Sequence, residues 1–305
     1  MIEGQESVLK CLLLNACSIR NKINELEVHI NNEELDIIAV TETWLTEDVL
    51  DSELLIPGFT LYRKDRFNVR DAKGGGVLVY INSQLVSIAV DKLNSKECES
   101  LFIQIGNIHK DGILFGICYR SNTASDYEIE QMLDAIATAS SSRLVVVGDF
   151  NYPNIDWDEL TCDAHSQRFF DIMTDSFLVQ HVLEPTRQNN VLDLVFSSEK
   201  DMIDNVCVLG HLGKSDHCMV QFDLHLSTVV KEFTGVKYCL YKGNYSAMRK
   251  FLQQFDWDLL LANKSAEEQW VVFKSILQDA MEKFIPKQSS CRKKEKCGLI
   301  EPRKS

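Results

Sequence analysis

Short apolar runs recur along the chain up to about residue 226, and brief polar or glycine-containing segments separate them. Valine, isoleucine and leucine dominate these runs, a composition that favours buried β-strands. The expected strands cover residues 8–15, 35–43, 58–63, 74–82, 99–106, 112–120, 143–151, 178–185, 191–198, 205–210 and 218–226. Amphipathic helical spacing is less frequent and covers residues 22–32, 125–140 and 166–177. Strands outnumber helices, so the pattern predicts two packed sheets with helices outside them.

The pattern changes beyond residue 226. Residues 265–286 begin with Ser265 and Glu268 at capping-box spacing, and Pro286 ends the segment. One helical face of this segment carries the apolar residues Trp270, Phe273, Leu277, Met281 and Phe284. We expect this stripe to pack against a neighbouring element or a partner protein and not to hold a cofactor.

The charge of the chain divides at the same place. Residues 1–226 carry 17 Lys and Arg against 36 Asp and Glu, a formal charge of −19, whereas residues 227–305 carry 15 against 9, a formal charge of +6. An acidic body does not attract nucleic acid broadly, but clustered carboxylates are what a divalent metal site requires. We therefore predict a body at residues 8–226, a helical linker segment at 227–286 and a basic, flexible tail at 287–305.

Several common features are missing from the sequence. No apolar run approaches the roughly 20 residues of a membrane span, and the N-terminal segment lacks the order of a signal peptide, which predicts an intracellular protein without membrane contact. The ten cysteines form no CxxC pair and several lie in apolar runs, so we expect reduced, buried thiols. The glycine run at residues 74–76 precedes a strand and not a helix, so no organic cofactor is expected.

Polar side chains stand at the ends of several expected strands. Asp149 and Asn151 directly follow a run of four apolar residues and Gly148. Other strand ends or beginnings carry Asn15, Glu42, Tyr119, Asp193, Asp216 and His217. In open α/β sheets ligands collect at the carboxyl ends of strands, although an acid and an amide after a strand also form ordinary turns.

The order of these residues is a stronger signal than any one of them. An asparagine, then "TETW", "YR", "GDFN", "LDLVF" and "SDH", resembles the endonuclease/exonuclease/phosphatase superfamily, which includes DNase I and the apurinic/apyrimidinic endonucleases. The segments "LNACSIRNK", "ELDIIAVTETWL", "GGGVLVYI" and "VLDLVF" are most similar to the endonuclease domain of non-LTR retrotransposons. The resemblance implies a four-layered α/β sandwich with a helical C-terminal extension that resembles the linker toward a reverse transcriptase. We expect the nuclease here without that reverse transcriptase.

The resemblance also implies metal-dependent cleavage of a phosphodiester bond in DNA, leaving a 3′ hydroxyl. Glu42 is the expected main ligand of Mg²⁺, with Mn²⁺ as an alternative, because magnesium prefers oxygen ligands. Asn15 and Asp216 are expected in the metal shell or just behind it.

The remaining expected roles concern the phosphate and the attacking water. Asp149 aligns or deprotonates the water, Asn151 and Tyr119 contact the phosphate, and Asp193 orients His217 toward it. Whether Asp149 or His217 is the general base stays open. Two further positions, Thr186 and Ser215, are candidate substrate contacts, and Ser215 could instead support its loop.

Two other functions remain open at this stage. The same fold could act on a small phosphoester, such as an inositol phosphate or a lipid head group, although the retrotransposon-like segments favour DNA. The chain could also be a non-enzymatic interaction module whose C-terminal helix docks a partner protein. A DNA substrate requires access to the nucleus, with the cytoplasm as the alternative location.

Overall fold

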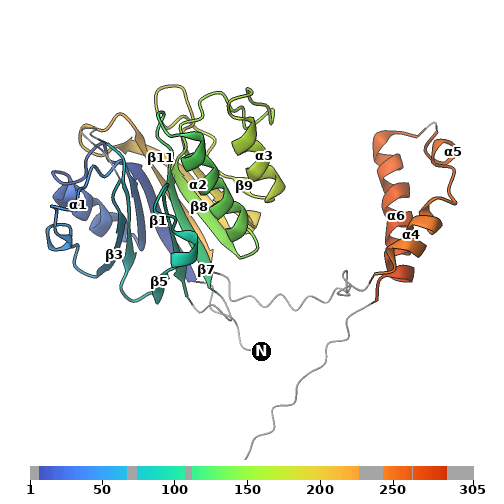
Figure 1. The fold of residues 1–305 in the computed structure, drawn as a ribbon, viewed down its shortest axis with the longest axis horizontal. Helices are drawn as coiled ribbons and strands as arrows, with labels where there is room; N and C mark the ends of the chain where they lie inside the picture. Colours follow the sequence, from blue (N-terminus) through green and yellow to red (C-terminus); the bar gives the residue numbers. More distant parts are fainter. Residues whose placement is uncertain (1–6, 67–73, 107–111, 227–242, 263, 287–305) are drawn as a thin grey trace, which may run out of the picture. The chain divides into compact units, whose positions relative to one another are not determined.

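The structure is a computed structural model that describes residues 7–66, 74–106, 112–226, 243–262 and 264–286. The chain divides into two compact units, Met1–Thr228 and Val229–Ser305. We call them the body and the C-terminal unit and describe each by itself. Among the described residues, the strands lie in the body, and the C-terminal unit is helical (Figure 1).

Two six-stranded sheets form the centre of the body, in the strand orders β11-β12-β1-β2-β4-β3 and β5-β6-β7-β8-β10-β9. The first sheet comprises β1 (Ser7–Asn15), β2 (Ile37–Thr41), β3 (Phe59–Lys64), β4 (Val77–Asn82), β11 (Ile203–His211) and β12 (Cys218–Leu226). The second comprises β5 (Ser87–Ala89), β6 (Glu99–Ile105), β7 (Ile113–Tyr119), β8 (Leu144–Asp149), β9 (Val179–Gln180) and β10 (Asp193–Ser197). Each sheet contains one parallel pair, β1 with β2 and β7 with β8, among antiparallel neighbours.

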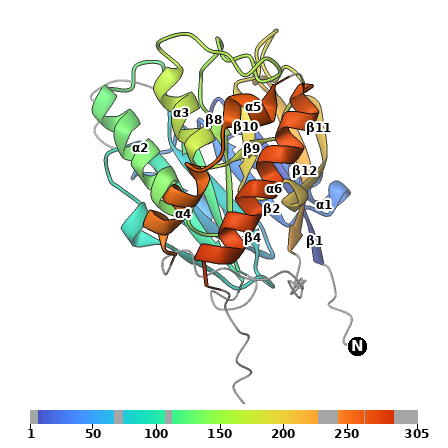
Figure 2. The same cartoon turned by 90° about the vertical axis from the view of Figure 1, so that its right-hand side faces the viewer.

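Helices cover the outer faces of both sheets. Helix α1 (Ile23–Glu33) packs Leu26 and Ile30 onto the first sheet, while α2 (Asp126–Ala139) and α3 (Gln167–Asp175) lie side by side on the second (Figure 2). A third apolar cluster fills the space between the sheets. The predicted α/β sandwich of two mixed sheets flanked by helices is confirmed, and the four layers follow from these three apolar interfaces.

Local sequence explains where these elements begin and end. The hydroxyl of Ser125 accepts from the backbone N–H of Glu128, and the Glu128 carboxylate accepts from the N–H of Ser125, which starts α2 with a capping box. Single turns of 3₁₀ helix at Asp51–Glu53, Asp91–Leu93 and Lys200–Met202 connect strands.

One expected strand is much shorter than predicted, and one strand was not predicted. Residues 178–185 give only the two-residue β9, because the Gln180 side chain bonds both the N–H and the C=O of Val182 and so occupies the groups that a ladder would use. The three-residue β5 carries too short an alternation to be recognised.

The expectation that every cysteine is buried was wrong. The seven described cysteines are free, as predicted, and Cys11, Cys98 and Cys118 are buried. Cys207 is exposed because it lies on β11, an edge strand of the first sheet.

The C-terminal unit contains α4 (Tyr245–Leu252), α5 (Trp257–Leu261) and α6 (Ala266–Phe284). Only α6 was predicted; its capping box joins Ser265 and Glu268. Its apolar stripe packs partly within the unit, with the ring of Phe284 centred 5.6 Å from that of Phe251, whereas Trp270 is 55% exposed. Within the described part of the chain, no helix is long and apolar enough to span a membrane. The predicted tail, residues 287–305, lies outside the described residues.

Candidate active site

The candidate residues meet at one edge of the sheets because each sheet contains a parallel pair of strands. In the first sheet Asn15 pairs in register with Thr41, which directly precedes Glu42. In the second sheet Tyr119 pairs in register with Asp149. The carboxyl ends of parallel strands lie at the same edge, so these polar side chains are collected there.

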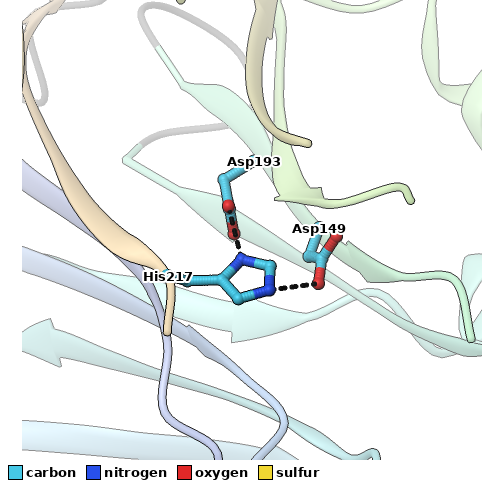
Figure 3. A group of neighbouring side chains, drawn as sticks. All are labelled: Asp149, Asp193 and His217. Atoms are coloured by element: carbon cyan, nitrogen blue, oxygen red, sulfur yellow. Dashed lines mark hydrogen bonds and ion pairs between the residues drawn. The ribbon is translucent and has the colours of Figure 1, made fainter. Parts of the chain in front are cut away.

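Asp193 and His217 reach the same place from antiparallel strands. Asp193 begins β10 and pairs with Asp149 across the sheet, and His217 immediately precedes β12. Figure 3 shows the three side chains pointing toward one another: Nδ1 of His217 lies 2.7 Å from Oδ2 of Asp193, and its Nε2 lies 3.9 Å from Oδ2 of Asp149. No more than 3% of any of these side chains is exposed.

In this buried group the pKa values of Asp149 and His217 both lie above their ordinary values. Burial and the neighbouring Asp193 carboxylate raise the pKa of Asp149 from 3.8 to about 8. Burial alone lowers the pKa of His217, but the hydrogen bond and negative charge of Asp193 outweigh it, so the pKa lies above its ordinary value. The neutral form of Asp149 and the charged form of His217 are therefore favoured relative to the free side chains.

Asn15 and Ser215 hold this group in place. Nδ2 of Asn15 donates to Oδ2 of Asp149 at 2.9 Å. The hydroxyl of Ser215 donates to the main-chain oxygen of Asn15 at 2.7 Å and accepts from the N–H of His217 at 3.2 Å. Since Ser215 is buried, its side chain ties β1 to the segment before β12, the loop-supporting alternative foreseen from the sequence.

Thr186 has no exposed surface. Its hydroxyl accepts from the backbone N–H groups of Leu192 at 3.1 Å and Asp193 at 3.0 Å, and its main-chain oxygen accepts from the N–H of Cys218. The side chain therefore fixes the start of β10, and the expected contact between Thr186 and substrate does not fit this burial.

Asp216 lies beside Asn15 on the more open side of the group. One of its carboxylate oxygens forms an ion pair with Arg187 at 2.6 Å, and the Sγ atom of Cys17 lies 3.5 Å from the other. Burial raises the pKa of Asp216, but the guanidinium of Arg187 outweighs burial and holds that pKa below its ordinary value. The same thiol lies 3.4 Å from Oδ1 of Asn15, so the two oxygens face a common point.

The carboxylate of Glu42 accepts from three donors. The Tyr119 hydroxyl donates to Oε1. Oε2 accepts from the indole N–H of Trp44 and, at 2.8 Å, from the backbone N–H of Gly75. Glu42 itself has a left-handed backbone, with φ of 52°, a conformation that is uncommon away from glycine. The negative charge of Glu42 raises the pKa of Asp149 further, which places it within electrostatic range of the buried group.

A second acid supports the glycine run that faces Glu42. The Glu99 carboxylate accepts from the backbone N–H of Gly76 and pairs with Arg66 at 2.6 Å. The Arg66 side chain lies so close to Gly75 that a Cβ atom there would be 2.2 Å from its Nε. The run favours glycine because its three residues have φ of 121°, 76° and 83°, which residues with a side chain rarely adopt.

The oxygen atoms of Glu42, Asn15 and Asp216 are suited to a divalent cation. Hard cations take carboxylate and amide oxygens. The Cys17 thiol lies within hydrogen-bond distance of Asn15 and Asp216, and burial and then nearby negative charges, that of Glu42 among them, raise the pKa of this thiol. The buried Asp149, Asp193 and His217 also bring three ligand atoms within 4.8 Å of one another. In that group, however, Nδ1 of His217 is already hydrogen-bonded to the Asp193 carboxylate at 2.7 Å.

Several residues of this edge were not foreseen from the sequence: Trp44, Glu99, Arg66, Arg187 and Arg120. Trp44 and Arg120 stand inside the motifs "TETW" and "YR", so their positions beside Glu42 and Tyr119 were the available signal. The contacts of Glu99, Arg66 and Arg187 depend on tertiary packing and have no signal in one sequence.

The body has the fold of solved endonuclease/exonuclease/phosphatase proteins, and a buried Asp–Asp–His group lies at one edge of its sheets. Residues 113–221 match a family model described as "Endonuclease-reverse transcriptase". The resemblance predicted from the motifs is thereby confirmed. No curated protein sequence matches the chain.

Solved structures similar to this chain share its fold at low sequence identity. The endonuclease domain of TRAS1, a telomere-specific non-LTR retrotransposon, is 18% identical with a TM-score of 0.56, covering 71% of this chain and 98% of that one. The AP endonuclease LMAP from Leishmania major is 14% identical with a TM-score of 0.56, covering 71% and 87%. The 3′ phosphatase NExo from Neisseria, bound to a product DNA hairpin, is 13% identical with a TM-score of 0.50, covering 71% and 99%.

Proposed function

We propose that this protein is a Mg²⁺-dependent DNA endonuclease, derived from a non-LTR retrotransposon, that nicks a phosphodiester bond and leaves a 3′ hydroxyl. The observation that carries the proposal is the convergence of Glu42, Asp149 and the Asp193–His217 pair at one sheet edge. Cleavage of a phosphodiester needs a cation, hydrogen-bond donors and an activated water, and this edge supplies groups for each.

Glu42 holds the metal in this proposal, with Asn15 and Asp216 contributing oxygens or orienting water around it. Mg²⁺ is the expected ion, and Mn²⁺, which accepts the same ligands, is the alternative. The bound cation supplies positive charge that offsets the negative charge of the phosphate and of the leaving oxygen. Tyr119 and Trp44 donate to the Glu42 carboxylate and so keep it in one orientation.

Asp149 accepts a proton from the attacking water in this mechanism. Its pKa, raised to about 8, makes the ionised form a stronger base than an ordinary carboxylate, and the positive charge of a cation held by Glu42 would favour that ionised form. Asn15 fixes the oxygen that faces His217. As the water oxygen bonds to phosphorus, the bond between phosphorus and the 3′ oxygen breaks, and that oxygen leaves with the bonding electron pair and takes a proton from solvent water to become the 3′ hydroxyl.

His217 faces the phosphate as an imidazolium, and Asn151 donates its amide to a phosphate oxygen. Asp193 supports the charged form of His217, because its hydrogen bond and charge raise the pKa of the ring. The Tyr119 hydroxyl, which donates to Glu42 in the absence of substrate, would turn to the same phosphate when the substrate binds. These assignments follow the superfamily resemblance and the arrangement of donors around the edge.

The proposal extends to partners and to the rest of the chain. We infer that double-stranded DNA is the substrate, which requires access to the nucleus. The body at residues 8–226 would act as the nuclease, with 227–286 as a linker segment. Exposure of Trp270 supports a partner protein at α6.

Nicking of a supercoiled plasmid tests this function. The wild-type protein should convert it to open circles with Mg²⁺ and not with EDTA, and Glu42→Ala and His217→Ala should remove the activity, while Glu47→Ala, an exposed acid on the same loop, should keep it. The new end should be extended by a DNA polymerase, because it carries a 3′ hydroxyl. Release of phosphate from small esters without nicking would favour the small-phosphoester enzyme, and neither activity would favour the interaction module.

A further inference from the structure

Arg120 is a buried cation that the proposed mechanism does not use. It directly follows Tyr119 at the end of β7, and 4% of its surface is exposed. Its NH1 group donates to the main-chain oxygens of Asn151 at 3.0 Å and Phe150 at 3.5 Å. Its NH2 group lies 2.8 Å from Nε2 of His165.

The partners of Arg120 are unusual for a buried guanidinium. They are two carbonyls, an imidazole and the ring of Tyr152, whose centre lies 4.1 Å from the guanidinium carbon, and none of these is a carboxylate. The Nε atom has no hydrogen-bond partner. Burying a cation without an anion beside it costs free energy, so the side chain contributes something other than the stability of an ion pair.

Arg120 holds Asn151 from both sides. While its NH1 group donates to the main-chain oxygen of Asn151, its own main-chain oxygen accepts from Nδ2 of Asn151 at 2.9 Å. Asn151 has a left-handed backbone, with φ of 53°, and its N–H donates to Oδ1 of Asp149 at 3.2 Å. The conformation of Asn151 thus depends on the Arg120 side chain, and one hydrogen of its amide remains for another acceptor.

We propose that Arg120 is a positioning residue that aims the Asn151 amide at the phosphate of the substrate. This inference rests on the proposed nuclease function, in which Asn151 donates to a phosphate oxygen. Arg120 itself is too buried to touch the substrate, and it acts through the carbonyl and the left-handed backbone of Asn151.

A double-mutant cycle between Arg120 and Asn151 tests the proposal. Arg120→Met retains much of the volume and removes the donors; we expect it to lower kcat for nicking about 30-fold, short of the roughly 100-fold loss on removing a phosphate donor altogether. KM should change less than about threefold, because the interaction improves in the transition state. In an Asn151→Ala background, Arg120→Met should change the rate by less than about threefold, since the group that it positions is already gone.

The controls separate positioning from folding. Arg120→Lys keeps the positive charge but lacks the planar set of N–H donors of the guanidinium. We therefore expect its kcat to lie between those of Arg120→Met and the wild type. Arg143→Met removes an arginine at the opposite end of β8, where it pairs with Glu199 at the surface at 3.5 Å, and should retain the wild-type rate. If Arg120→Met lowers kcat by the same factor in the wild-type protein and in the Asn151→Ala variant, the proposal is overturned, because equal factors indicate general destabilisation.

A readout independent of activity distinguishes failure of this inference from failure of the nuclease function. The Nδ2 hydrogens of Asn151 should exchange slowly with solvent in the wild-type protein and at least about tenfold faster in Arg120→Met, as seen by NMR. If the wild-type protein does not nick DNA, the proposed function fails, and this exchange rate still decides whether Arg120 holds Asn151. Unchanged exchange in Arg120→Met contradicts the inference.

Discussion

The Asp193 carboxylate lies 2.7 Å from Nδ1 of His217, and neither side chain is more than 3% exposed. This hydrogen bond fixes the ring so that Nε2 faces Asp149. Because the carboxylate offsets the effect of burial, it decides the protonation state of the imidazole.

Replacing Asp193 by Asn should therefore change both the rate of DNA nicking and the pKa of His217. With the charge gone, burial dominates and the pKa of His217 should fall below its ordinary value. The nicking rate should fall by about 10²- to 10⁴-fold, the upper figure being the loss known for an Asp-to-Asn change in a Ser-His-Asp triad. An NMR titration of the imidazole checks the first effect and a pH–rate profile the second. An unchanged pKa would show that Asp193 only fills space.

Asp149 should make the stability of the metal-free protein fall as the pH rises from mildly acidic to neutral. Its folded-state pKa is raised to about 8, so the stability linked to its neutral form is fully present below the unfolded pKa and is lost as pH rises toward 8. Asp149→Asn removes this titration. Relative to the wild type, the variant should therefore become more stable between pH 5 and pH 7, by on the order of 2 kcal/mol.

Urea unfolding in EDTA at the two pH values measures this difference. Asp158 is an exposed acid in the same connection after β8, and Asp158→Asn serves as the control. The difference in free energy of unfolding between this variant and the wild type should be the same at both pH values. A constant difference between Asp149→Asn and the wild type at both pH values would mean that Asp149 is ionised throughout.

Metal binding should stabilise the body through Glu42. A ligand at about 100 times its Kd contributes about 2.7 kcal/mol to the free energy of unfolding, so saturating Mg²⁺ or Mn²⁺ should raise Tm by about 5 to 10 °C for a body of this size. Glu42→Gln should lose most of the increase, because a neutral amide is a weaker ligand. Glu47→Gln should keep it. Equal increases in both variants would place the ion elsewhere.

Gly148 is expected to be intolerant of any side chain. Its φ is +155°, and a Cβ atom would lie 1.8 Å from the main-chain oxygen of Cys118 on the neighbouring strand. Gly148→Ala should lower the stability by about 3 kcal/mol or more, through overpacking and backbone strain, and should abolish nicking by displacing Asp149. Gly210→Ala has no atom within 4 Å of the new Cβ and should change stability by less than about 1 kcal/mol. Chemical denaturation of both variants makes the comparison.

The sequence was sufficient for the parts of the fold that depend on local pattern. The apolar runs predicted the buried strands β1, β2, β7 and β8, and the polar residues at their ends marked the shared edge. Helix α6 was foreseen from Ser265 and Glu268, because a capping box is read within four residues.

The parts that were missed depend on contacts between distant segments. The early end of β9 results from one side chain, Gln180, that takes the backbone groups of Val182. The roles of Arg120 and Trp44 depend on the left-handed backbone of Asn151 and Glu42, which no periodicity encodes. Thr186 was predicted to contact the substrate, and it is instead buried because β10 returns beside it.

The two parallel ladders have a consequence for how the protein can fail. Asn15 is aligned with Thr41 in one ladder, and Tyr119 with Asp149 in the other. Successive side chains of a strand point to opposite faces, so a slip by one position turns every group to the wrong side. A molecule with a misaligned ladder would therefore have no activity at all, and would not merely act slowly. The active fraction of a preparation would equal the fraction of molecules in which both parallel strand pairs have formed in the correct register.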